Sequence, residues 1–226
     1  RRFYHPNLMH ALDIVIDVVE GIIDIDLVLP IGTFSLDEIE IDDEKIVLNI
    51  VSDIIRPIEF LHRFRILHLD VKPENYIVYL KKKNYVTTKL TDFGLALYQD
   101  HISHRSFDQE LISKAYRPPE LLDNLDEYHY SQKSDIWSLG LTIYELIINE
   151  RVTLQFEDTS NFKDRVVQLV NKNKIETKIE YNFFASDKLY KDYFNSEDEF
   201  MKNLSFMIVS TLCPNPKYRF NTKKLV

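Results

Sequence analysis

The chain has 226 residues, of which 45% are hydrophobic, so it is long enough to bury the core of one compact domain. Its formal net charge of −8 argues against a protein whose main partner is a nucleic acid, because phosphate binding needs basic residues gathered on one face. A single cysteine, Cys213, excludes an internal disulfide and a multi-cysteine metal site, which fits a reducing compartment.

The apolar stretch of residues 11–31 predicts two paired β-strands rather than a membrane span. Acidic residues interrupt it repeatedly, whereas a spanning helix needs about 20 apolar residues in a row. Residues 12–19 and 22–29 are rich in β-branched side chains and partly alternate, with Glu20 and Gly21 between them. We therefore expect a β-hairpin here and no membrane partner.

A long helix is predicted from residue 42 onward. Apolar residues recur there at helical spacing behind an acidic start that suits a helix N-terminus: Ile46, Ile50, Ile54, Ile58 and Leu61. Pro57 falls within this pattern and removes a backbone hydrogen bond, so we expect a kink at that turn.

Short strands are predicted at residues 76–80 and 85–90, joined by a polar turn. After an irregular stretch, helical spacing returns at residues 134–148, 162–170 and 197–212. The second half of the chain is therefore expected to be mostly helical.

The loop expected after the long helix carries residue types that suit phosphoryl transfer. Asp70 is followed by Lys72 and Asn75, and Asp92 comes after the second short strand. An aspartate can accept the proton of a substrate hydroxyl, a lysine can contact the transferred phosphate, and asparagine and aspartate oxygens can hold Mg²⁺. Few other reactions need these residue types together.

The order and spacing of these motifs resemble the eukaryotic-type Ser/Thr protein kinase catalytic domain over essentially the whole chain. The matching segments are His-x-Asp-x-Lys-Pro-x-Asn at 68–75, Asp-Phe-Gly at 92–94, Tyr-Arg-Pro-Pro-Glu at 116–120, Asp-x-Trp-x-x-Gly at 135–140, and Arg219. Pro118 stands where the family usually has Ala. The Tyr-Arg pair before Pro-Pro-Glu is most similar to the branch of cyclin-dependent, mitogen-activated and dual-specificity kinases.

The resemblance implies a protein-kinase-like α+β fold that lacks part of its small lobe. Residues 1–32 would be the remnant of the small lobe, with its last two strands and the hinge, and residues 33–226 the large helical lobe. The implied partners are ATP with Mg²⁺ and a protein substrate, and not nucleic acid or a membrane. We expect an intracellular protein, cytoplasmic or nuclear, and within a host cell if its source is viral.

Within this resemblance, three residues take catalytic roles and two hold the metal. Asp70 would orient and deprotonate the substrate hydroxyl, Lys72 would contact the γ-phosphate, and Ser113 would bridge the two. Asn75 and Asp92 would hold Mg²⁺ and contribute to nucleotide binding. Lys72 and Ser113 favour a Ser/Thr kinase over a Tyr kinase.

The resemblance also places the adenine site. Leu29 would be the gatekeeper at the end of the second strand, and Pro30 would begin the hinge. The usual contacts there are the carbonyl of the first hinge residue and the N–H of the third, here Gly32, so a proline is compatible with ATP. Ile77 would pack beneath the adenine ring.

Several other motif residues are expected to be structural. His68 would pack against Phe93 rather than act as a second acid or base, and Asp135 would accept hydrogen bonds from the catalytic-loop backbone. Glu120 and Arg219 would form a buried ion pair.

The sequence departs from the kinase pattern at Leu69, where most kinases have an arginine that pairs with a phosphorylated activation loop. Without that guanidinium, a phosphate on the loop loses its main partner. We therefore expect that phosphorylation of Ser103 or Ser106 does not control activity in the usual way.

A larger departure concerns the nucleotide clamp. The chain has four glycines in all and its first lysine is Lys45, past the expected hinge, so neither a glycine-rich loop nor an early nucleotide-anchoring lysine exists in it. Residues 5–7 resemble the loop that follows the first helix of the small lobe. A kinase built on this chain is therefore expected to be active only together with upstream small-lobe elements.

Two alternatives remain beside an active protein kinase. A pseudokinase or binding module would dock a protein partner without phosphoryl transfer, although the presence of Asp70, Lys72, Asn75 and Asp92 argues for catalysis. A small-molecule kinase of the aminoglycoside or choline type would share an Asp and an Asn in a similar loop. The segment at 116–120 speaks against it, because it resembles kinases of protein substrates.

Overall fold

The computed structural model describes residues 3–41, 43–81, 85–102, 112–121, 130–148, 199–213 and 215–225. The strands are β1 (Asp13–Val19), β2 (Ile22–Val28), β3 (Phe34–Ser35), β4 (Ile66–Leu67), β5 (Tyr76–Lys81), β6 (Tyr85–Leu90) and β7 (Leu97–Tyr98). The helices are α1 (Glu44–Arg63), α2 (Gln99–Ile102), α3 (Gln132–Ile148) and α5 (Glu199–Thr211). The predicted α+β class is confirmed, and the helix expected at 162–170 lies outside the described residues.

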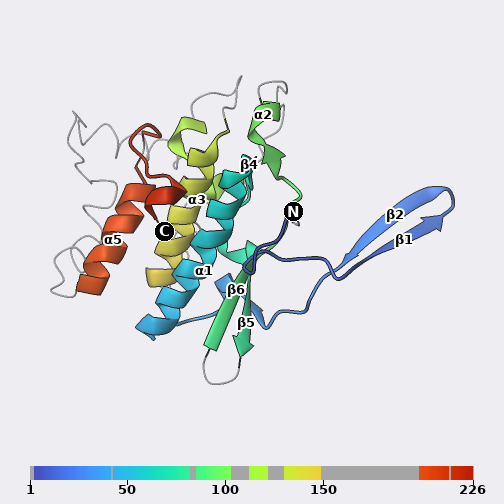
Figure 1. The fold of residues 1–226 in the computed structure, drawn as a ribbon, viewed down its shortest axis with the longest axis horizontal. Helices are drawn as coiled ribbons and strands as arrows, with labels where there is room; N and C mark the ends of the chain where they lie inside the picture. The colour runs from blue at the N-terminus through green and yellow to red at the C-terminus, as the bar shows by residue number, and fades with distance from the viewer. Residues whose placement is uncertain are drawn as a thin grey trace.

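The predicted hairpin forms, and it projects away from the body of the molecule (Figure 1). β1 and β2 pair antiparallel, and the two residues between them, Glu20 and Gly21, have φ of 52° and 82°. Positive φ at both positions of a two-residue loop matches the twist of the paired strands, and glycine adopts it without steric cost. The prediction of separate units at 1–32 and 33–226 stays a prediction.

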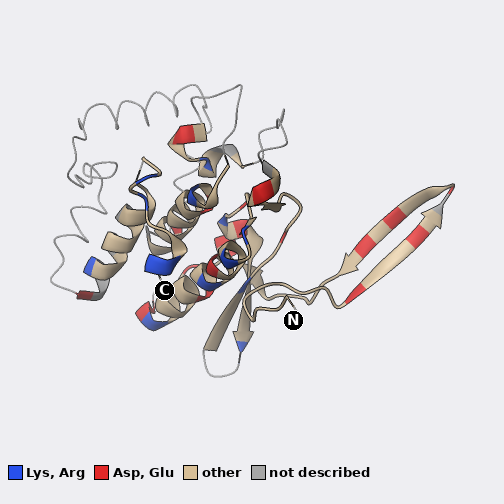
Figure 2. Cartoon of the chain, turned by 45° about the horizontal axis from the view of Figure 1, so that its top comes forward, with Lys and Arg blue, Asp and Glu red and all other residues tan. Residues whose placement is uncertain are grey.

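The hairpin has one apolar face and one face on which aspartates alternate with Val15, Ile22 and Val28. Paired residues share a face, so Ile14 with Leu27, Ile16 with Ile25 and Val18 with Ile23 gather on one side, each side chain 56–68% exposed. The other side holds four aspartates, seen as red bands along both strands in Figure 2: Asp13, Asp17, Asp24 and Asp26. The hairpin therefore presents an apolar surface that the rest of the described chain does not cover.

Helix α1 lies between strand β6 and helix α3 and contacts both. Asp43 caps its start by accepting hydrogen bonds from the backbone N–H groups of Lys45 and Ile46 at 2.8 and 3.2 Å. The predicted apolar stripe is buried, with Ile50, Ile54 and Ile58 fully inaccessible. The helix continues through Pro57, which is buried, and the kink expected at that turn stays a prediction. α1 packs on β6 on one side and on α3 on the other, and α5 packs on α3 (Figure 1).

A three-stranded antiparallel sheet, in the order β3, β5, β6, lies beside α1. The first described residues attach to its edge, where the side-chain amide of Asn7 donates to the Thr88 carbonyl at 2.9 Å. Backbone bonds from Leu90 to Asn7 and from Met9 to Leu90 continue this attachment. No helix among the described residues is both long and apolar enough to cross a membrane.

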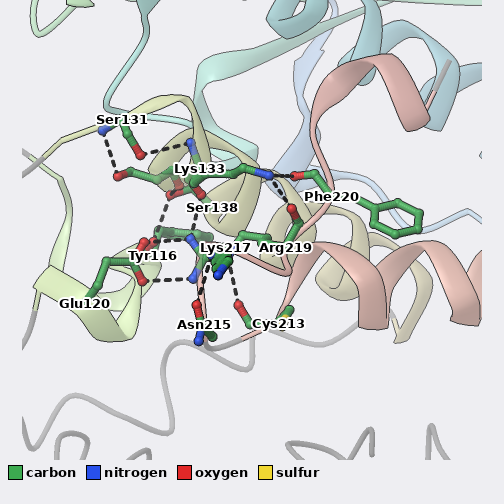
Figure 3. A network of polar contacts seen from close by, with 11 residues as sticks. Tyr116, Glu120, Ser131, Lys133, Ser138, Cys213, Asn215, Lys217, Arg219 and Phe220 are labelled. Carbon is green, nitrogen blue, oxygen red and sulfur yellow. Dashed lines mark hydrogen bonds and ion pairs between the residues drawn. The ribbon is translucent and has the colours of Figure 1, made fainter. Parts of the chain in front are cut away.

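The predicted pair of Glu120 and Arg219 is confirmed and lies at the centre of a polar network (Figure 3). Arg219 donates to both carboxylate oxygens of Glu120, at 2.7 and 2.8 Å, while its own side chain is fully buried. Its Nε and Nη1 also donate to the carbonyls of Cys213 and Lys133, and its guanidinium lies 5.0 Å from the Trp137 ring centroid. The network ties the end of the chain to the start of α3.

Candidate active site

One carboxylate, that of Asp135 in the first turn of α3, accepts hydrogen bonds from the backbone of the loop between β4 and β5. Its two oxygens accept the backbone N–H groups of His68 and Leu69, each at 2.9 Å, and the ring of His62 lies 2.9 Å from Oδ2. Leu69 has φ of 63°, a conformation that costs energy for a branched side chain and persists only where contacts enforce it. The predicted structural role of Asp135 is confirmed.

The structure brings Asp70, Lys72 and Ser113 together. Ser113 Oγ donates to Asp70 Oδ1 at 2.9 Å, and Lys72 Nζ lies 2.8 Å from Asp70 Oδ2 and 3.4 Å from Ser113 Oγ. Ser113 comes from a segment far along the chain, so this triangle exists only in the folded protein. The assigned catalytic roles stay predictions, and the contacts they require are present.

The environment of Asp70 favours its carboxylate form. Burial alone would raise its pKa, but hydrogen bonds from Lys72, Asn75 and Ser113 outweigh burial and hold the pKa below its usual value. Asp70 is therefore ionised at neutral pH, as a residue that accepts a hydrogen bond or proton from a hydroxyl must be.

Asn75 and Asp92 offer oxygens that fit a magnesium ion. The side-chain amide nitrogen of Asn75 donates to the Asp70 carbonyl at 2.7 Å and to Asp70 Oδ2 at 2.8 Å, so the nitrogen faces Asp70 and the amide oxygen of Asn75 takes no part in these two bonds. A backbone bond from Thr91 N–H to the Asn75 carbonyl, 2.9 Å, places Asp92 beside it. Asp92 is exposed, and two such hard oxygens leave room for the water and phosphate ligands that Mg²⁺ prefers.

His68 is neutral and structural. Burial lowers its pKa, and its ring Nε2 lies 3.1 Å from the Thr91 carbonyl while Nδ1 lies 3.3 Å from the Asp70 N–H. Only the tautomer protonated on Nε2 satisfies both contacts. Its ring centroid is 5.2 Å from that of Phe93 in an edge-on arrangement, so the predicted packing is confirmed, although Phe93 is 37% exposed.

Leu69 is 1% exposed and belongs to the hydrophobic core, so the position that usually senses phosphate is filled by apolar packing. Ser103 and Ser106 lie outside the described residues. We expect that Ser103→Ala and Ser106→Ala each leave the phosphorylation rate of a peptide substrate within about threefold of the wild type. A steady-state assay on both variants would measure this, and a drop of tenfold or more in either would contradict it.

The residues predicted to meet adenine lie at the connection between the hairpin and the sheet. Gly32 packs directly on Ile77, because a Cβ at Gly32 would fall 1.9 Å from Ile77 Cγ2. Thr33 N–H donates to the Val78 carbonyl at 2.9 Å, which holds the connection against β5. Leu29 comes just after β2 and its side chain is 41% exposed. The structure thus brings Gly32 and Ile77 together and leaves Leu29 partly open to solvent.

Two site neighbours were not predicted from the sequence. His62 on α1 contacts Asp135 and belongs to no recognised motif. Its one signal in the sequence was its position four residues after Ile58, on the apolar stripe of the helix. Tyr79 donates its hydroxyl to the Pro30 carbonyl at 3.3 Å. Strand alternation after Ile77 would have placed Tyr79 on the same face.

Comparison with known proteins agrees with this geometry. Residues 1–226 match the model of the protein kinase domain. The chain is similar to Serine/threonine-protein kinase NLK2 of Xenopus laevis, with 30% identity over 176 residues, which are 74% of this chain and 37% of that protein. It is also similar to Cyclin-dependent kinase 7 of Caenorhabditis elegans, with 31% identity over 182 residues, 76% of this chain and 49% of that protein. The chain therefore spans less than half the length of these relatives.

Proposed function

Because this chain belongs to the protein kinase family, we propose that it carries the phosphoryl-transfer centre of a Ser/Thr protein kinase. The cyclin-dependent relative agrees with the branch that the Tyr116-Arg117 pair favours. The proposed reaction moves the γ-phosphate of ATP to a serine or threonine hydroxyl of a protein. We also propose an intracellular setting, which a chain with one free thiol fits.

The observation that carries the proposal is the triangle of Asp70, Lys72 and Ser113. An ionised carboxylate, an ammonium within 2.8 Å of it and a bridging hydroxyl supply an acceptor for the substrate proton and a cation for the transferred phosphate. Asn75 and Asp92 would hold Mg²⁺, which neutralises charge on the phosphates. A binding module would have no use for this combination.

The nucleotide clamp is proposed to come from elements outside these 226 residues. The chain lacks a glycine-rich loop and has no lysine before Lys45, and the apolar face of the hairpin is exposed. An uncovered apolar surface of this kind marks a site that another element packs against. Upstream small-lobe elements would bury that face and complete the phosphate site.

For the 226-residue chain alone we expect Mg-ATP affinity too weak to detect, because the phosphates lack both the backbone cradle and the anchoring lysine. Calorimetric titration of the folded chain with Mg-ATP measures this. Micromolar binding would contradict the proposed need for added elements.

The acceptor class is tested with three peptides that differ in one residue, serine, threonine or tyrosine. The natural protein that contains these residues is incubated with each peptide and Mg-ATP, and mass spectrometry reports the phosphopeptide. We expect phosphate on serine and threonine and none when EDTA removes the metal. Transfer to tyrosine alone would overturn the assignment.

A further inference from the structure

Tyr79 on β5 contacts the connection between hairpin and sheet, and no catalytic motif accounts for it. Its hydroxyl lies 3.3 Å from the Pro30 carbonyl oxygen, to which it donates. Tyr79 follows Ile77 by two residues on a strand, so the two side chains share one face of β5. The hydroxyl therefore reaches Pro30 from the side on which Ile77 packs against Gly32.

The Pro30 carbonyl is the better of the two acceptors within reach of this hydroxyl. The other is the sulfur of Met9, at 3.5 Å, and a thioether is a weak acceptor. Burial raises the pKa of Tyr79, so the hydroxyl keeps its proton and remains a donor at neutral pH.

Little else in the described chain orients the Pro30 peptide group. Proline has no N–H, so its carbonyl is its one backbone hydrogen-bonding group, and the next residue, Ile31, is 95% exposed. The neighbouring anchors act later in the connection, where Thr33 N–H donates to Val78 and Thr33 Oγ1 accepts from Leu80 N–H at 3.2 Å. The Tyr79 hydroxyl extends this anchoring back to Pro30.

We propose that Tyr79 is a positioning residue for adenine recognition, holding the Pro30 carbonyl so that its second lone pair accepts the 6-amino group of the base. A carbonyl oxygen can accept two hydrogen bonds, so the hydroxyl and the base need not compete. Without the hydroxyl, the nucleotide itself would have to order the peptide group and would bind more weakly. This inference rests on the proposed kinase function.

The test compares Tyr79→Phe with the wild type in the natural protein, using ATP and purine riboside triphosphate, which lacks the 6-amino group. Loss of one hydrogen bond predicts a KM for ATP about three- to tenfold higher with kcat within about twofold. The KM for the analogue should not change. Tyr76→Phe is the matched control, because Tyr76 also donates to a backbone carbonyl, that of Ile54 at 3.2 Å, but from the opposite face of the same strand. It should leave both KM values unchanged.

Three results would overturn the role of Tyr79 while leaving the kinase proposal in place. An equal rise in KM for both nucleotides would show that the contact is merely structural. An unchanged KM for ATP would show that the contact has no role in nucleotide binding. A lower KM for ATP would show that the hydroxyl competes with the base for the Pro30 carbonyl. A wild-type protein that transfers no phosphate from either nucleotide would overturn the proposed function, and this role with it.

Discussion

Replacing Asp70 by asparagine is expected to lower kcat for peptide phosphorylation by about 10²- to 10⁴-fold. The amide cannot take up the substrate proton. Its surroundings accommodate the amide, because its oxygen can take the place of Oδ2 and accept from Lys72 Nζ and Asn75 Nδ2, while its nitrogen donates to the hydroxyl of Ser113. Steady-state kinetics on the natural protein would measure the loss, with the KM for ATP expected to change little.

Asp100→Asn is the matched control for this experiment. Asp100 is also an aspartate in an ion pair, with Arg65 at 2.5 Å, but it is 54% exposed and lies outside the catalytic triangle. Its substitution should leave kcat within about twofold. If Asp70→Asn kept more than about a third of the wild-type kcat, Asp70 would not be the residue that receives the proton.

The largest expected effect on stability is at the buried ion pair. Glu120→Gln should lower the free energy of unfolding by about 3 kcal/mol, because it removes the charge that pairs with the buried guanidinium of Arg219 at 2.7 Å. Glu120 is itself 22% exposed, which places the expected loss at the lower end of the range for buried pairs. Urea denaturation followed by circular dichroism would measure it.

The double variant Glu120→Gln with Arg219→Met separates the loss of the ion pair from the cost of keeping the Arg219 charge buried after Glu120 is replaced. With neither charge present, part of the lost stability should return. The exposed pair of Arg65 and Asp100 gives the contrast, since Asp100→Asn should cost less than about 1 kcal/mol. A Glu120→Gln variant as stable as Asp100→Asn would show that the buried charge of Arg219 does not depend on Glu120.

Long elements and motif residues could be predicted from the sequence because their signals are local. The apolar stripe of α1 and the alternation of β1 and β2 repeat over several turns or pleats, so period alone identifies them. Pro57 weakened the helix prediction at one turn, yet the helix is continuous there. The two-residue strands β3, β4 and β7 could not be predicted, because two residues contain no period.

Some residues of the candidate site could likewise be predicted from local spacing, and others could not. Asp70, Lys72 and Asn75 lie within one short loop, so spacing was enough to group them. Ser113 could be placed beside them only through the family resemblance, and the structure supplies the contact at 2.9 Å. The hydrogen bond from Tyr79 to Pro30 joins residues far apart in sequence and depends on how β5 meets the connection, which no local pattern encodes.

The most direct test of the account is transfer of labelled γ-phosphate from ATP to a serine peptide by the natural protein that contains this chain. The account predicts labelled phosphoserine that requires Mg²⁺, because an ionised Asp70 contacts both Lys72 and Asn75, and Asp92 follows the residue whose N–H bonds to the Asn75 carbonyl. A natural protein that is folded and binds ATP but leaves the peptide unlabelled would contradict it, and would assign the chain to a binding role.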